Sequence, residues 1–322
     1  MPDRNVVVFL GGTSGIGREA IKVLLAAPQP RRPWHVILGS RTPKGDYFGK
    51  QYLDRPSSAE GDLVDCFHLD LSRFQSVRTF AAQLEKYVIG PIETLVLCAG
   101  IICMKKRTTE DGYEETMQVN ALAEALLLDL LWPKLSAPGR KSRILFVSSA
   151  LHLRAAKKRR LTPSNIDTYP KPNRYKTMSA YADSKLLLMH IFYLAEIRSQ
   201  SDPNTRGCEV IALSPGFVPF TGLVRESGCL ANWASKWILP WLPFAKTPQQ
   251  SGSFIAQFIT DAPLYPEAAV HDERAPLLPK SGTYVSISKG EIPAAEECYD
   301  EHVRNAWLEV LRDRGLWHAR IA

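Results

Sequence analysis

A short apolar run, followed at once by a glycine-rich turn and a helix, constrains the fold of this chain more than any other stretch. Asn5–Leu10 (NVVVFL) has apolar side chains on both faces, which is typical of a buried parallel strand. Gly11, Gly15 and Gly17 follow, and residues 18–27 have a helical pattern. Glycines permit a tight turn and a close approach to a pyrophosphate at the helix N-terminus. The pattern therefore predicts a dinucleotide-binding unit.

Strands and helices alternate through the rest of the chain, which predicts an α/β, doubly wound Rossmann fold. With 322 residues we expect one domain, 1–322, around a parallel seven-stranded sheet. The further strands are expected at 34–39, 63–69, 93–97, Arg143–Val147, 209–213 and 282–287. The further helices are expected at 72–88, 112–135, 181–199, 247–261 and 294–314.

The composition excludes some classes of protein but does not identify a ligand. A formal charge of +7, from 40 Lys and Arg against 33 Asp and Glu, is compatible with a phosphate, a nucleic acid or a membrane surface. Six cysteines and seven histidines show neither a CxxC pair nor metal-ligand spacing, so we expect no metal. No signal peptide and no apolar run of about 18 residues is found, so a cytoplasmic protein without a transmembrane segment is expected.

Residues after the second, third and fourth strands indicate which dinucleotide binds. Ser40 and Arg41 end the second strand where an acid commonly holds the ribose of NAD, and an arginine suits a 2′-phosphate instead. The sequence therefore favours NADP over NAD. Asp70 either meets the adenine or caps the next helix, and capping is the preferred interpretation. The stretch Cys98-Ala99-Gly100 is small enough for a close cofactor approach.

The pair Tyr181 and Lys185 is the main catalytic candidate. Their spacing places both on one face of a helix. An adjacent ammonium favours the phenolate, so we expect Lys185 to lower the pKa of Tyr181 toward neutral pH. Asn120, inside an apolar helix, is either bonded to backbone or holds a water beside the site. Ser149 ends the fifth strand, where it either contacts a ligand or caps the following segment.

Two segments stand apart from the alternating pattern. Residues 150–180 are an expected insertion loop before the tyrosine helix, and its basic run 157–160 is interpreted as a solvated loop rather than a localisation signal or an anion patch. Residues 221–246 are an expected substrate lid, because the aromatic stretch 228–245 follows the sixth strand. Core packing and attachment to a membrane surface or partner subunit are the alternatives for these aromatics. Nucleic-acid binding is not expected.

These motifs resemble the short-chain dehydrogenase/reductase family over almost the whole chain. Gly11, Gly15 and Gly17 match the family's cofactor glycines, although Leu10 stands where Thr is usual and Cys98 replaces an Asn. Protochlorophyllide reductases and retinol-dehydrogenase-like members are similar in the stretches around Tyr181 and 215–226, except that Phe217 stands where the photoenzymes carry Cys. The family's catalytic tetrad falls on Asn120, Ser149, Tyr181 and Lys185.

The resemblance implies an NADPH-dependent ketoreductase or secondary alcohol dehydrogenase, in the style of fungal secondary metabolism, that acts on a bulky hydrophobic small molecule. A redox-neutral epimerase, isomerase or cyclase, and a non-catalytic NADPH-binding regulator, are the alternatives. The family also suggests a homo-oligomer. Expected NADP contacts, besides Asn120, Tyr181 and Lys185, are Gly11, Thr13, Ser14, Gly15, Ile16, Gly17, Ser40, Arg41, Asp70, Leu71, Cys98, Ala99, Gly100, Pro215, Gly216, Val218 and Thr221.

Overall fold

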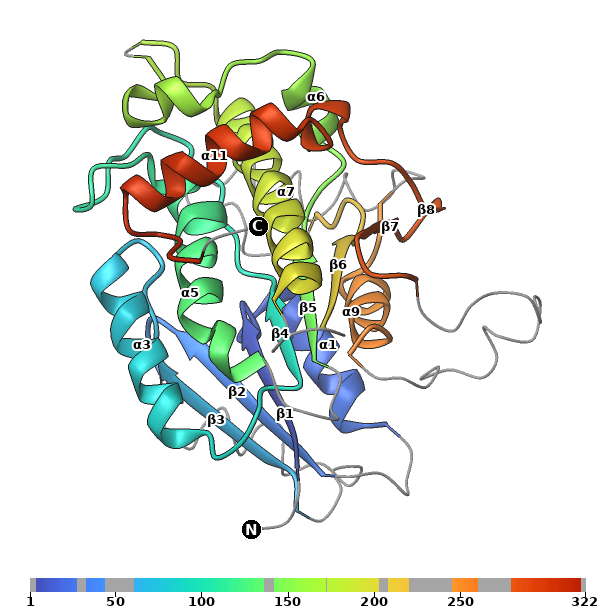
Figure 1. Ribbon diagram of the computed structural model, residues 1–322. Coiled ribbons are helices and arrows are strands. Elements are labelled where there is room, and N and C mark those ends of the chain that lie inside the picture. The colour runs from blue at the N-terminus through green and yellow to red at the C-terminus, as the bar shows by residue number, and fades with distance from the viewer. Residues whose placement is uncertain are drawn as a thin grey trace.

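One sheet forms the centre of the computed structural model (Figure 1). The structure describes residues 4–27, 33–43, 61–135, 142–171, 173–202, 208–219, 245–259 and 279–319. In this part of the chain the strand order is β3-β2-β1-β4-β5-β6-β7-β8, and every pair except β7–β8 is parallel. The strands are β1 Asn5–Leu10, β2 Trp34–Ser40, β3 Leu63–His68, β4 Thr94–Leu97, β5 Arg143–Val147, β6 Glu209–Ser214, β7 Thr283–Ser286 and β8 Gly290–Glu291.

The predicted doubly wound sheet is confirmed, with one correction to the strand count. Seven parallel strands were expected, and the sheet has an eighth, β8, which pairs antiparallel with β7 at the edge. This strand is Gly290–Glu291, and both of its residues are exposed. Two exposed residues leave no apolar alternation in the sequence, so a pattern search does not find such a strand.

Helices cover both faces of the sheet (Figure 1): α3, α5 and α7 lie on one side, and α1 and α9 lie on the other. A last helix, α11, runs across the ends of α5 and α7. The α-helices are α1 Gly15–Leu25, α3 Phe74–Tyr87, α4 Glu115–Met117, α5 Ala123–Leu131, α6 His152–Ala156, α7 Thr177–Ser201, α9 Pro248–Ala256 and α11 Glu301–Asp313. Short 3₁₀ and π segments are η1 Gln118–Leu122, η2 Trp132–Leu135, η3 Pro163–Thr168 and η5 Glu296–Cys298.

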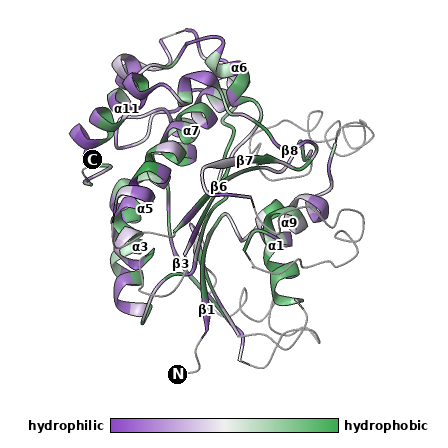
Figure 2. Ribbon diagram, turned by 45° about the vertical axis from the view of Figure 1, so that its right-hand side comes forward, coloured by the Kyte–Doolittle hydropathy of each residue, from purple (hydrophilic) through white to green (hydrophobic). Residues whose placement is uncertain are grey.

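Apolar residues on both faces of the strands build two cores. Along β1, Val8 and Leu10 belong to the core beneath α3, α5 and α7, whereas Val7 and Phe9 belong to the core beneath α1 and α9. Hydropathy colouring shows the same division, with hydrophobic residues on the strands and the inward faces of the helices (Figure 2). Burial on both faces is why the strands read as continuous apolar runs rather than alternating ones.

The expected helix 112–135 is interrupted. It begins at α4, where the Glu114 carboxylate caps it by accepting from the backbone N–H groups of Thr116 and Met117. It then widens into the π-helix η1 before continuing as α5. Single-turn π segments inside α-helices are frequent at functional sites. Asn120 lies in the middle of this one.

The segment 150–180 contains more structure than the expected loop. It contains the short helices α6 and η3 and leads directly into α7. The expected lid at 221–246 falls almost wholly outside the described residues, as do its aromatic stretch 228–245 and Thr221.

Candidate active site

The glycine turn after β1 is packed too tightly for any other residue. Gly11 has φ +75°, and a Cβ there would lie 2.8 Å from the Cys98 carbonyl oxygen. A Cβ on Gly17 would lie 2.3 Å from the carbonyl oxygen of Gly11. Real Cβ atoms do not come this close, so the glycines let the turn lie on the end of β4 and let α1 start against the turn.

The N-terminus of α1 is suited to an anion. The helix has 11 residues, its N-cap Ser14 makes no side-chain capping bond, and its first turn contains no acidic residue. Backbone N–H groups at such a terminus, together with the helix dipole, stabilise a phosphate. The glycine cradle and this terminus fit the pyrophosphate of a dinucleotide.

Ser149, Tyr181 and Lys185 come together at the carboxyl end of β5. The Ser149 hydroxyl lies close enough to the phenol of Tyr181 to lower the pKa of that phenol. The Lys185 ammonium donates to the Val147 carbonyl oxygen at 2.9 Å, at the last residue of β5. Tyr181 and Lys185 are 8% and 3% exposed. Both lie on α7, which therefore holds the phenol and the ammonium against the end of β5, two residues before Ser149.

Asn120, on the π-helix η1, forms hydrogen bonds that connect the end of β4 with α7. Its side-chain oxygen accepts from the Ile101 backbone N–H at 2.8 Å, and its amide donates to the Ile101 carbonyl oxygen at 3.0 Å. The same amide donates to the Ser184 hydroxyl at 3.1 Å. The side chain therefore joins the backbone beyond β4 to the helix that carries Tyr181.

Burial dominates the protonation of Tyr181 and Lys185. Desolvation raises the pKa of Tyr181 to about 12, and the nearby Ser149 hydroxyl opposes the rise. The expected lowering of this pKa by Lys185 is not seen, because burial is the largest influence on the Tyr181 phenol and raises its pKa. Burial lowers the pKa of Lys185. Tyr181 is therefore a proton donor at neutral pH, a role that suits reduction of a carbonyl.

Two further ionisable groups lie beside this pair. Burial raises the pKa of the Cys98 thiol to about 12 and that of the Glu124 carboxyl to about 8, and in both cases the nearby Lys185 ammonium opposes the rise. Cys98 was expected as a cofactor contact, whereas Glu124 was missed. A signal was available, because Glu124 is an acid inside an apolar run and lies one helical turn after Asn120.

A buried histidine fixes the loop that carries Ser149. His152 accepts at Nε2 from the Ala295 backbone N–H at 3.2 Å, so its Nδ1 donates to the Ser149 carbonyl oxygen at 2.7 Å. Burial lowers the pKa of His152, which keeps the ring neutral and this tautomer in place. Sequence reasoning missed His152 because its partner Ala295 is distant in the chain.

The segment 150–180 is attached to α7 by an ion pair between Arg160 and Asp183. Arg160 donates to both Asp183 oxygens, at 2.9 and 2.6 Å, and the Tyr169 hydroxyl donates to the same carboxylate. Asp183 is fully buried and lies two residues after Tyr181. Arg160 is the last residue of the basic run 157–160. It pairs with a buried carboxylate, whereas the other three basic side chains of the run are exposed.

The remaining expected cofactor residues lie along the carboxyl edge of the sheet. Arg41 is exposed directly after β2. Asp70 accepts from the Ser72 backbone N–H at 3.0 Å ahead of α3, in a local turn, while Arg73 is the N-cap residue. Gly216, with φ +85°, follows β6. The structure thus brings the residues after β1, β4, β5 and β6 to one edge, as expected for ligand binding in an open parallel sheet.

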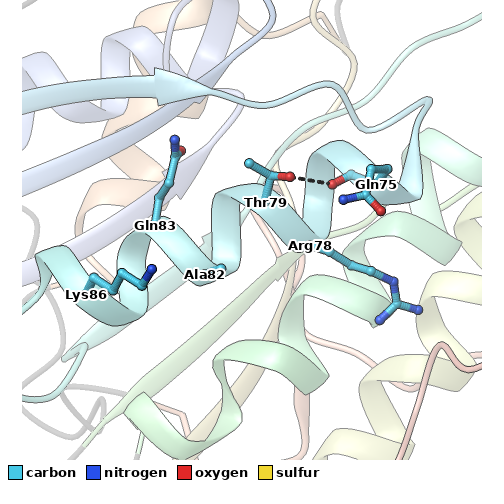
Figure 3. Close-up of a pocket in the computed structure, with 6 residues that line it drawn as sticks. All are labelled: Gln75, Arg78, Thr79, Ala82, Gln83 and Lys86. Atoms are coloured by element: carbon cyan, nitrogen blue, oxygen red, sulfur yellow. Dashed lines mark hydrogen bonds between the residues drawn. The ribbon is translucent and has the colours of Figure 1, made fainter.

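A separate hollow lies on the outer face of α3 (Figure 3). Its volume is about 440 Å³, and all its lining residues belong to α3: Gln75, Arg78, Thr79, Ala82, Gln83 and Lys86. None of these is a site residue. Within the described residues no cluster of three metal-ligating side chains is found, and no helix is long and apolar enough to cross a membrane.

Comparison with known proteins identifies the family. A family model described as short chain dehydrogenase matches residues 5–158. Human polyprenol dehydrogenase is 31% identical over 256 residues, which cover 77% of this chain and 70% of that relative. The chain belongs to the short-chain dehydrogenase/reductase (SDR) family. Members are oxidoreductases that bind nicotinamide cofactors, and the confirmed fold and the predicted family agree with this membership.

Further relatives of this SDR protein extend the match over the whole chain. Human retinol dehydrogenase 13 is 29% identical over 333 residues, covering 98% of this chain and 86% of that relative. Among solved structures, the NADPH-bound carbonyl reductase from chicken fatty liver shares the fold with a TM-score of 0.57 and 19% identity, covering 90% and 99% of the two chains.

Proposed function

We propose that this SDR protein is an NADP(H)-dependent ketoreductase or secondary alcohol dehydrogenase that acts on a bulky apolar carbonyl compound or alcohol. One observation carries the proposal: the Ser149 hydroxyl lies beside the Tyr181 phenol at the end of β5, with Lys185 one helical turn further along α7. A hydroxyl pair of this kind can hold and protonate a substrate oxygen. Neither group would be needed by a protein that only senses a dinucleotide.

The residues present fit a nicotinamide dinucleotide. The turn at Gly11 and Gly17 leaves its backbone open to close approach, and the α1 terminus suits a pyrophosphate. Arg41, exposed after β2, would pair with the 2′-phosphate that distinguishes NADP from NAD. When bound, the cofactor would supply or accept the hydride.

The side chains around the substrate oxygen have separate roles in the reaction. In reduction, Tyr181 donates its phenolic proton to the carbonyl oxygen while Ser149 hydrogen-bonds the same oxygen and stabilises its growing charge. Lys185 places a positive charge near the phenolate that Tyr181 becomes. Asn120 keeps α7 aligned with the end of β4 through Ser184 and Ile101.

An apolar substrate is supported by exposed side chains at the start of α7 and after β6. Met178 is in the first turn of α7, three residues before Tyr181, and the Thr177 hydroxyl beside it bonds the Met104 carbonyl oxygen at 3.2 Å. Met178, Met104 and Phe217 are 54%, 42% and 43% exposed. The names of the two human relatives, polyprenol dehydrogenase and retinol dehydrogenase 13, also point to long apolar alcohols.

Tyr181→Phe tests the proposal most directly. We expect it to lower kcat for NADPH-dependent reduction of bulky ketones and aldehydes by about a thousandfold or more, because the only proton donor proposed for the substrate oxygen is removed. The Kd for NADPH, measured by fluorescence titration, should stay within about threefold. Tyr193→Phe removes a hydroxyl further along the same helix and is the matched control.

Wild-type turnover in Tyr181→Phe, or equal losses in both variants, would contradict the assignment. Product formation by the wild type without net NADPH consumption would identify the redox-neutral alternative.

A further inference from the structure

The segment 292–298 joins β8 to α11 and passes beside α6, the short helix that begins three residues after Ser149 (Figure 1). Ala294, Ala295 and Cys298 of this segment are buried, so it is packed into the fold. The proposed chemistry at Ser149, Tyr181 and Lys185 does not use it. Its contacts nevertheless lead to the catalytic serine.

Two contacts fix the ends of the segment. The Ile292 backbone N–H donates to the Tyr284 carbonyl oxygen of β7 at 3.0 Å. The Glu297 carboxylate pairs with the ring Nε2 of His190, a buried residue of α7, at 3.2 Å. Because both partners belong to elements of the core, the backbone between them, including the Ala295 N–H, is held in one position.

His152 connects this fixed N–H to Ser149. Its Nε2 accepts from Ala295 at 3.2 Å, so the ring proton is on Nδ1, which donates to the Ser149 carbonyl oxygen at 2.7 Å. The His152 backbone N–H donates to the same oxygen at 3.1 Å. The fully buried ring lies edge-on to Tyr284, with the ring centres 5.0 Å apart. Its orientation and its tautomer are therefore both set by the surroundings.

The position of the Ser149 carbonyl oxygen affects where the Ser149 hydroxyl lies. The hydroxyl oxygen accepts from the Leu151 backbone N–H at 3.3 Å, inside the same turn, which leaves its own proton for another oxygen. A rotation of this peptide would move the hydroxyl away from the phenol of Tyr181. Displacing a catalytic group by about 1 Å can cost about a hundredfold in rate.

We propose that the segment 292–298 is a positioning element of the active site that acts on Ser149 through His152, an inference that rests on the proposed dehydrogenase function. Neither His152 nor the segment takes a proton or a hydride in the reaction. Together they hold the Ser149 hydroxyl where it meets the substrate oxygen. Their loss therefore lowers kcat and leaves cofactor binding unchanged.

Two substitutions at His152 separate its two hydrogen bonds. Glutamine keeps an acceptor near the Nε2 position for Ala295, whereas asparagine keeps a donor near the Nδ1 position for Ser149. We expect His152→Gln to lower kcat by about tenfold or more and His152→Asn to stay within about threefold of wild type. The Kd for NADPH should stay within about threefold in both.

His302→Gln removes an exposed imidazole from the first turn of α11 and is the matched control, with an unchanged kcat. Equal losses of kcat in His152→Gln and His152→Asn would mean that the ring serves packing alone, and overturn the proposal.

A double-mutant cycle tests the segment itself. Glu297→Ala releases one end of it, at a side chain that is 21% exposed, so the protein should still fold. We expect kcat to fall about threefold in this variant and to fall no further when the change is made in His152→Gln, because both act on Ser149 by one route. Losses that multiply, or an unchanged kcat in Glu297→Ala, overturn the proposal.

The ring tautomer separates this inference from the proposed function, since it is measured without turnover. NMR of the apo-protein with ¹⁵N-labelled histidine should show a neutral ring protonated at Nδ1, and this signal should vanish in His152→Gln. A ring protonated at Nε2 overturns the proposal. If the Nδ1 tautomer is found and Tyr181→Phe remains active, the contact with Ser149 stands and the dehydrogenase assignment falls.

Discussion

The proposed preference for NADP over NAD rests on one residue, Arg41. It follows β2 at the ribose end of the proposed site and is exposed. Charge-assisted hydrogen bonds to a phosphate are stronger than neutral ones, and NADH carries no 2′-phosphate to receive them. At the residue scale, NADP selectivity should therefore respond to this side chain alone.

Arg41→Ala should raise the KM for NADPH by about tenfold, since a hydrogen bond to a charged group contributes about 1.5–3 kcal/mol. The KM for NADH should change by less than about twofold. Steady-state kinetics with both cofactors check this, and Arg154→Ala, which removes an exposed arginine from α6, is the control. Equal effects on both cofactors would mean that Arg41 does not bind the 2′-phosphate.

At the element scale, the segment 150–180 and α7 are joined through one carboxylate. Asp183, inside α7, receives Arg160 and the Tyr169 hydroxyl from the insertion. Burial raises the pKa of this carboxyl in spite of these bonds. The arginine and tyrosine therefore compensate for a costly buried acid and hold the segment 150–180 in place.

Asp183→Asn should destabilise the fold by about 2 kcal/mol, less than the 3–5 kcal/mol of a fully buried pair because the Arg160 side chain is 34% exposed. We expect a Tm lower by several degrees and faster tryptic cleavage within 150–180. Asp167→Asn, which breaks an ion pair whose Asp is 63% exposed, should change neither. An unchanged cleavage rate in Asp183→Asn would show that the ion pair does not hold the insertion.

At the scale of the whole molecule, the segment after α11 is fixed to the helices beneath it. Asp129 on α5 accepts from Arg198 on α7 at 2.7 Å and pairs with the ring Nδ1 of His318 at 2.6 Å. The Arg198 guanidinium lies 4.1 Å from the Trp132 ring centre and 5.3 Å from that of Trp317. Arg198 on α7 therefore contacts α5, η2 and the segment after α11, which are distant from it in sequence.

Trp317→Ala should lower the free energy of unfolding by about 3–5 kcal/mol, because a fully buried indole is removed. His318→Ala removes a 60% exposed partner of Asp129 and should cost about 1 kcal/mol or less. Urea unfolding of both variants measures the difference. Similar midpoints for the two would mean that the indole does not stabilise this junction.

The sequence predicted what depends on local pattern. Apolar runs located the seven parallel strands, and the spacing of Tyr181 and Lys185 placed them on one helix, because these signals lie within a few residues of one another. The π-helix around Asn120 and the two-residue β8 leave no periodic signal. His152, whose partner is Ala295, depends on a distant contact. The roles of the site residues, the NADP preference and a setting in secondary metabolism stay predictions.

The burial of α7 on every side has a consequence for how such an enzyme can change. From Ala180 to Glu196 every residue of this helix is buried. A substitution that re-aims Tyr181 would therefore also disturb the packing that keeps the protein folded. New substrates are more easily acquired through the loops that surround the helix, which can vary in sequence without that penalty. Related enzymes should therefore keep the reaction type and differ in their substrates.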